Sequence, residues 1–314
     1  MPLPSDSQIL KTSQELVSQL QTIFGKHAGI RPAHGKGLLL IGTFQPSKEA
    51  ATLSTAPHLN QSTTPLTIRF SNSTGLPNIP DTDPNANPRG IGIRFNLGDH
   101  VHTDIVAHST PHFPTRTGAE FLEFLRALVA PAPEKGGPSA VEQFLGSHPA
   151  ALAFVSAPKP APSSFARETF YGVNALKFIN EEGKETYFRY RIVPSLGEDH
   201  LDDAGLKEKG PDFLFEELSK RLKSSEPTYF KLLAQIAEEG DAVDDCTVHW
   251  PESRKLMELG EIRVEKVMEE NVKEQKKIIF DPIPRVRGIE ASADPLLEMR
   301  ASVYLLSGRE RRAT

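Results

Sequence analysis

The chain contains 314 residues, of which 38% are hydrophobic and 25% are charged, so it is long and apolar enough to bury a large core. Its formal net charge is −5 and its sequence pI is about 6.1, which excludes the basic surface expected of a protein bound to nucleic acid or anionic lipid. The single cysteine, Cys246, excludes an internal disulfide framework and a multi-thiolate metal site, and we expect its side chain to be buried.

The first ten residues, MPLPSDSQIL, contain no basic region followed by an apolar stretch. Nowhere does the chain hold a run of about 18 apolar residues. We therefore expect no export signal, no membrane span and a cytoplasmic location.

The first predicted element is an amphipathic helix over residues 6–25, with Asp6 as its N-cap and Gly25 as its stop. Segments of β-branched or alternating apolar residues follow, separated by clusters of Pro, Asn, Asp and Gly. They predict neighbouring strands of one antiparallel sheet or barrel, at 37–44, 66–71, 91–97 and 103–107.

The remainder of the chain mixes helices with further strands. A helix is predicted over 117–130, and after a Pro-rich stretch the alternating segments 170–178 and 186–193 indicate a β-hairpin. The pattern is helical over 201–240, and short strands return near Ile262 and Ile278. A final helix begins within 292–295, where a capping residue precedes a proline suited to a first helical turn.

These elements predict a single α+β domain, because the chain shows neither an internal repeat nor a linker. We expect an N-terminal helix (1–28), an antiparallel β-barrel (29–200), and a C-terminal part with helices, short strands and the last helix (201–314).

The last predicted helix carries three residues that could serve a common chemistry. Arg300 and Tyr304 are four residues apart, and Arg311 is seven further on, so all three project from roughly one face. A guanidinium held against a phenol oxygen favours the phenolate, which is the form that binds a ferric ion. The spacing is also typical of a surface stacking pair, so it gains weight only beside other features.

His34 stands between a proline and glycines just before the first predicted strand, in the segment RPAHGKG. This placement can present its side chain over a cavity. An imidazole there can take a proton from one oxygen of a peroxide and return it to the other. By itself His34 could equally be an ordinary core or surface histidine.

Several separated segments resemble the haem catalases, in the same order along the chain. RPAHGKG is similar to their distal-histidine segment, IRFSNSTG to the strand whose serine supports that histidine, and NPRGIGIRF with DIVAHSTPHF to the next two strands. FDPIPRVRGIEASADPLLEMRASVY resembles the family's approach to its proximal tyrosine. The resemblance covers the chain from about residue 30 to its C-terminus. It implies a catalase-type antiparallel barrel and bound ferric haem b.

The resemblance also implies a role for each matching residue. His34 becomes the distal acid and base and Ser71 its hydrogen-bond partner, while Tyr304 becomes the axial ligand of the iron, as in catalase, and Arg300 its charge partner. The remaining matches are the arginines that bind the haem propionates and the aromatic residues on the distal side, which are Arg31, Arg69, Arg311, Phe113 and Phe121.

The sequence departs from the family pattern at several places. His108 stands where the family has a distal asparagine, Gly308 replaces a histidine four residues after the tyrosine, and the chain ends ten residues after Tyr304. We expect His108 to alter the distal pocket while remaining a catalytic residue. The short C-terminus predicts an open haem, no bound NADPH, and a monomer or small homo-oligomer.

These features predict a short, catalase-related peroxidase that reduces hydrogen peroxide or an organic hydroperoxide with a small organic reductant, with residual catalase activity. The alternative is a haem enzyme dedicated to one organic substrate, either an isomerase or lyase of lipid hydroperoxides or an oxidative cyclase. In allene oxide synthase relatives a threonine typically precedes the distal histidine, and Ala33 here disfavours that alternative.

Two other classes of protein remain open from the residues alone. A non-haem metal site could use four histidines close in sequence, His100, His102, His108 and His112. A catalase-like binding or stress protein without turnover would not need the retained His34, Arg300 and Tyr304.

Overall fold

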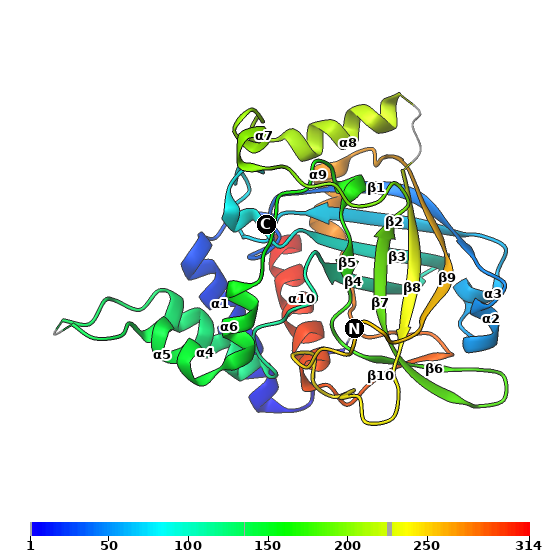
Figure 1. Ribbon diagram of the computed structural model, residues 1–314, viewed down its shortest axis with the longest axis horizontal. Coiled ribbons are helices and arrows are strands. Elements are labelled where there is room, and N and C mark those ends of the chain that lie inside the picture. The colour runs from blue at the N-terminus through cyan, green and yellow to red at the C-terminus, as the bar shows by residue number, and fades with distance from the viewer. Residues whose placement is uncertain (1, 135, 225–227) are drawn as a thin grey trace.

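An antiparallel β-barrel forms the centre of the protein in a computed structural model that describes residues 2–134, 136–224 and 228–314 (Figure 1). In these ranges eight strands close the barrel in the order β7-β5-β4-β3-β2-β1-β9-β8, with β8 paired again to β7. Two more strands, β6 (Leu176–Ile179) and β10 (Ile289–Ala291), extend the sheet beside β7. The barrel strands are β1 (Gly37–Pro46), β2 (Thr64–Ser71), β3 (Gly90–Gly98), β4 (Val101–His108), β5 (Phe170–Tyr171), β7 (Glu185–Pro194), β8 (Thr228–Ile236) and β9 (Leu256–Val267).

Alternation along β2, β3 and β4 divides their side chains between the barrel interior and its outer face. The interior receives Leu66, Ile68 and Phe70 of β2, and Phe70 stacks on Phe165 with ring centroids 5.0 Å apart. The outer face receives the residues that alternate with them, which on β2 are Thr67, Arg69 and Ser71. Polar side chains can therefore be presented outside the barrel without disturbing its apolar core.

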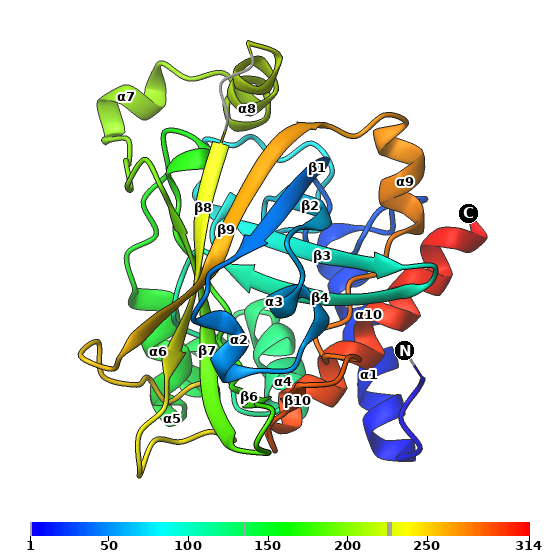
Figure 2. The same cartoon turned by 90° about the vertical axis from the view of Figure 1, so that its right-hand side faces the viewer.

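Helices cover one side of this outer face. The long helices α1 (Ser7–Phe24) and α10 (Pro295–Ala313) lie side by side, and α4 (Gly118–Leu128) packs against both (Figures 1 and 2). Asp6 caps α1 and Asp294 caps α10, each through a carboxylate oxygen that accepts from backbone N–H groups. The remaining helices are α2 (Ala50–Leu53), α3 (Pro57–Asn60), α5 (Ala140–Ser147), α6 (Pro149–Ser156), α7 (Asp203–Lys207), α8 (Phe213–Lys223) and α9 (Asn271–Lys277), with 3₁₀ turns η1 (Pro84–Ala86) and η2 (Phe165–Arg167).

The predicted helices over 6–25 and 117–130 and the last helix are confirmed, and so is the antiparallel barrel. The part of the chain that the structure describes contains no helix long and apolar enough to cross a membrane. Cys246 is buried, as predicted.

The helical prediction over 201–240 is only partly right. Helices α7 and α8 lie there, residues 225–227 are outside the described residues, and β8 occupies the following stretch as a strand. The segment TYFKLLAQI is apolar enough to suit either state, and pairing with both β7 and β9 decides for a strand. Together with β9 it carries the barrel beyond the predicted limit at residue 200.

Two further predictions of strands need correction. Ile278 is not in a strand, because it directly follows α9 and its carbonyl accepts from arginine side chains instead of a neighbouring strand. The predicted hairpin arm 170–178 is divided, since β5 pairs with β4 and β7, and β6 forms the hairpin with β7. Gly172, next to β5, is packed against Tyr190 of β7.

Candidate active site

A cavity of about 260 Å³ lies between the outer face of β2, β3 and β4 and the helices α1 and α10. The structure brings every predicted site residue to its walls, although they come from distant parts of the chain. These residues are Arg31, His34, Arg69, Ser71, His108, Phe113, Phe121, Arg300, Tyr304 and Arg311.

His34 is held above the cavity by its backbone and by its ring. Its φ is 56°, in the left-handed region that few residues other than glycine adopt, and its N–H donates to the carbonyl of Ser73 at 2.9 Å. Its Nδ1 lies 3.1 Å from Ser71 Oγ. A Cβ at Gly90 would stand 2.7 Å from both of these side-chain atoms, so only glycine leaves room for the pair. Sequence reasoning did not identify Gly90 as a site residue.

Both histidines that line the cavity are neutral at pH 7. Burial, together with the positive charge of Arg69, lowers the pKa of His34 to about 4. Burial and the charge of Arg300 lower the pKa of His108 to about 3. A neutral imidazole can accept a proton, so His34 is ready to act as a base. The buried Nε2 of His108 has no hydrogen-bond partner among the described residues.

Tyr304 meets its predicted partner on α10. Arg300 Nε and Nη2 lie 3.3 and 3.1 Å from Tyr304 Oη, so a positive charge faces the phenol oxygen. Arg300 Nη1 in turn donates to Asn174 Oδ1. Asn174 Nδ2 donates to Oδ2 of Asp294 at 2.8 Å, and Asp294 is the residue that caps α10. The chain of contacts fixes Arg300 from behind.

Asn174 and Asp294 were not predicted as site residues. Asp294 gave a signal only as part of the expected start of the last helix, and Asn174 gave none, because it lies in a short connection far from that helix in sequence. Burial raises the pKa of Asp294.

Three guanidiniums converge at another wall of the cavity. Arg69 and Arg311 are buried and Arg31 is half-buried, and no Asp or Glu in the described ranges lies within ion-pair distance of any of them. Burial and their mutual repulsion lower the pKa of Arg69 to about 9 and that of Arg31 well below its ordinary value. Burial lowers the pKa of Arg311 to about 10. This excess positive charge suits a ligand with carboxylate groups.

Aromatic side chains form an apolar wall. Phe113 and Phe121 lie with ring centroids 5.8 Å apart, and His108 is 6.2 Å from Phe113. Gly308, where the resemblance predicts a missing histidine, leaves space for Ile279, since a Cβ at Gly308 would lie 2.2 Å from Ile279 Cδ1. An aliphatic side chain therefore occupies this part of the wall.

The four histidines of the alternative metal site do not converge. His100 lies in an exposed turn, His102 Nδ1 lies 3.2 Å from Asp104 Oδ1, and His112 contacts the ring of His249. Within the described residues no group of three or more His, Cys, Asp or Glu could hold a metal ion.

Comparison with known proteins agrees with this arrangement. The family model described as Catalase matches residues 5–314. The chain is 32% identical to the catalase-related peroxidase of Synechococcus elongatus over 96% of this chain and 88% of that one, and 32% identical to the catalase-related peroxidase of Mycolicibacterium paratuberculosis over 94% and 93%. The chain therefore belongs to the catalase family, whose members are oxidoreductases that act on peroxide.

Solved catalases share the fold. Catalase A from Saccharomyces cerevisiae superposes with a TM-score of 0.79 at 21% identity, over 94% of this chain and 64% of that one. A bacterial catalase superposes with a TM-score of 0.78 at 23% identity, over 95% and 60%. The chain thus spans about three fifths of these larger proteins but most of the length of the catalase-related peroxidases.

Family membership implies haem, and the cavity fits that group. Arg31, Arg69 and Arg311 offer positive charge that no protein carboxylate in the described ranges balances, as two propionates require. A phenol oxygen facing a guanidinium and a largely apolar wall complete the match.

Proposed function

We propose that the protein is a haem-dependent peroxidase that reduces hydrogen peroxide or an organic hydroperoxide with a small organic reductant. The observation that carries the proposal is the presence of two supported pairs in one cavity, His34 with Ser71 and Tyr304 with Arg300. The first pair can move a proton, and the second can supply an anionic oxygen ligand. Membership of the catalase family supports the same reading.

In this proposal ferric haem b is held by residues from both ends of the chain. Tyr304 would bind the iron, Arg300 would stabilise its phenolate, and Phe113 and Phe121 would lie on the apolar side of the site. Arg31, Arg69 and Arg311 pair with its propionates. The bound haem supplies the redox chemistry needed to cleave the O–O bond.

His34 moves the proton that this cleavage requires. Because its imidazole is neutral, it accepts the proton of the peroxide oxygen that approaches the cavity, and then returns it to the oxygen that leaves as water or an alcohol. Ser71 Oγ bonds to Nδ1 and so keeps the ring oriented, with Nε2 free to exchange the proton. The enclosing apolar wall strengthens these polar contacts.

His108 is the second polar group that we propose for peroxide binding, as a neutral imidazole where catalases have an asparagine. It differs from an amide in bulk and in the direction of its hydrogen bonds. We therefore propose that peroxide reduction by an organic donor exceeds disproportionation, which remains a residual activity. Lipid hydroperoxides are also candidate substrates.

Several expectations from the sequence stay predictions. They are the single-domain organisation of residues 1–314, a monomer or small homo-oligomer, the absence of NADPH, and a cytoplasmic location.

An absorption spectrum of protein expressed with a haem supply tests the proposal. We expect a high-spin ferric spectrum in the wild type and its loss in Tyr304→Phe, with oxidation of a phenolic dye exceeding oxygen release after addition of hydrogen peroxide. Absence of haem from the wild type would contradict the proposal. Rapid loss of a fatty-acid hydroperoxide without any reductant would favour an isomerase or lyase instead.

A further inference from the structure

We infer that Arg94 and Asp104, on the outer face of the barrel, are positioning residues for the arginines that bind the carboxylates of the cofactor. The inference rests on the proposed haem-binding function. Arg94 belongs to β3 and Asp104 to β4, and they face each other across the two strands. Neither is among the residues that line the cavity, so any influence must pass through another part of the chain.

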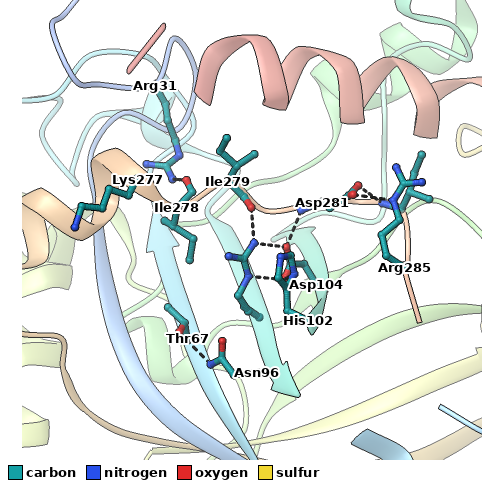
Figure 3. A network of polar contacts seen from close by, with 12 residues as sticks. Arg31, Thr67, Asn96, His102, Asp104, Lys277, Ile278, Ile279, Asp281 and Arg285 are labelled. Atoms are coloured by element: carbon teal, nitrogen blue, oxygen red, sulfur yellow. Dashed lines mark hydrogen bonds and ion pairs between the residues drawn. The ribbon is translucent and has the colours of Figure 1, made fainter. Parts of the chain in front are cut away.

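The intermediate is the short irregular segment that follows α9, residues 278–281. The carbonyl oxygen of Ile278 accepts from Arg31 Nη2 at 2.9 Å and from Arg311 Nη2 at 2.8 Å. One backbone oxygen thus orients two guanidiniums that lie near opposite ends of the chain. Figure 3 shows Arg31 directed toward Ile278.

Arg94 and Asp104 hold this segment at two successive points. Arg94 Nη2 donates to the carbonyl of Ile279. Asp104 Oδ2 accepts from the backbone N–H of Asp281 at 2.7 Å (Figure 3). Because the segment has no strand or helix of its own, these side chains replace the backbone pairing that would otherwise fix it. Asp281 is further restrained by Arg285 Nε, which donates to its Oδ2 at 2.9 Å.

The geometry of the pair is that of a strong ion pair. Arg94 Nε and Nη2 donate to the two oxygens of Asp104 at 2.9 and 2.7 Å, and the Asp104 side chain is 0% exposed. Burial alone would raise the pKa of Asp104, but hydrogen bonds from Arg94 and His102 outweigh it, and the pKa is lowered. A charged, fully enclosed carboxylate in a fixed position is well suited to hold a backbone N–H.

The same segment also shapes the apolar wall. Phe280 packs against Gly92, where a Cβ would lie 3.1 Å from its ring, and Ile279 fills the space beside Gly308. Both side chains line the cavity. A shift of the segment would therefore move the carboxylate-binding arginines and part of the wall together, although Arg94 and Asp104 never touch the ligand.

The test compares two ligands that differ only in their carboxylates, ferric haem and its dimethyl ester. The haem-free full-length chain is titrated with each ligand and binding is followed by absorbance. We expect Asp104→Asn to weaken haem binding by about tenfold, the size of a lost charge-assisted hydrogen bond. Binding of the ester should weaken by a clearly smaller factor, because the ester keeps its contacts with the apolar wall but has no carboxylates for the arginines. Arg94→Lys, which keeps the charge but loses the paired geometry, should act in the same direction and serves if Asp104→Asn fails to fold.

The matched control is Asp241→Asn. Asp241 receives two hydrogen bonds from Arg254, at 2.9 and 3.0 Å, and lies outside the cavity, so its loss should alter neither affinity. If the folded variants at Arg94 and Asp104 bind haem as the wild type does, or lose haem and ester equally, the positioning role is wrong. If the wild type itself binds neither ligand, the proposed function fails instead.

Discussion

Ser71 Oγ lies 3.1 Å from His34 Nδ1, so this hydroxyl supports the imidazole of the proposed distal base. In Ser71→Ala the ring loses this bond, and we expect the rate of peroxide reduction to fall about tenfold, as for the loss of one hydrogen bond. Stopped-flow measurement of peroxide consumption checks this. Ser54→Ala is the control, because the buried Ser54 hydroxyl donates to the carbonyl of Gly288 at 2.7 Å and lies outside the cavity. Equal rates in the two variants would contradict the role of Ser71.

Asn174 holds Arg300, so removing the Asn174 amide should change the contact between Arg300 and Tyr304. In Asn174→Leu the Nη1 group of Arg300 loses its acceptor and Asp294 Oδ2 loses its donor. We expect the ferric absorption bands to shift and the rate of haem dissociation to rise about tenfold. Transfer of haem to an excess of apomyoglobin measures the dissociation. Unchanged spectrum and dissociation in a folded variant would show that Asn174 does not act on the tyrosine.

His108 offers a test of peroxidase against catalase activity. His108→Asn restores the residue that the family resemblance implies and replaces a bulky ring with an amide. The ratio of oxygen release to dye oxidation should rise about tenfold, since one better-directed hydrogen bond is worth that factor. His112→Asn is the matched control, because His112 does not line the cavity. A rise of the same size in the control would indicate an indirect effect.

Acid should destabilise the protein as the pH falls below the ordinary pKa of histidine. Burial lowers the pKa of His58, on α3, to about 3 from 6.5, and that of His34 to about 4, so the unfolded chain binds protons that the folded chain does not. Each such histidine lowers the free energy of unfolding by about 1.4 kcal/mol per pH unit as the pH falls from its unfolded pKa toward its folded pKa.

His58→Leu isolates this effect. His58 is packed against Phe95, with ring centroids 4.4 Å apart, and its buried Nδ1 has no hydrogen-bond partner in the described part of the chain. Leucine removes the titration while keeping an apolar contact. Urea unfolding of the haem-free chain between pH 6.5 and pH 4.5 should show a shallower loss of stability in the variant. Parallel pH profiles would mean that His58 contributes nothing to acid sensitivity.

Sequence alone led to the residues that line the site but not to Asn174 and Asp294, which hold Arg300 from behind. His34, Ser71, Arg300 and Tyr304 stand in segments whose order and spacing are characteristic, and all of them line one cavity. Asn174 has no such signal, because its role depends on a hydrogen bond from Arg300, on a helix more than a hundred positions away. Local pattern carries no information about a partner at that distance.

The fold likewise contains elements that the local sequence predicts and elements that depend on distant neighbours. Strands such as β2 reveal themselves by alternation, since one face meets the barrel core and the other does not. Strand β8 resembles a helix in sequence, and only its two neighbours in the closed barrel determine its state. A short strand was predicted near Ile278, whereas the segment after α9 is held by side chains of the neighbouring strands β3 and β4.

The carbonyl of Ile278 joins Arg31, 247 positions earlier, to Arg311 near the other end of the chain. On a ribosome these groups are made at widely separated times, and Arg31 can reach the carbonyl of Ile278 only after the long stretch of chain between them has closed. In the proposed binding mode, in which Arg31, Arg311 and Tyr304 hold haem, capture of haem therefore follows the synthesis and docking of α10. Until then the barrel strands must fold, or be protected, without help from the cofactor.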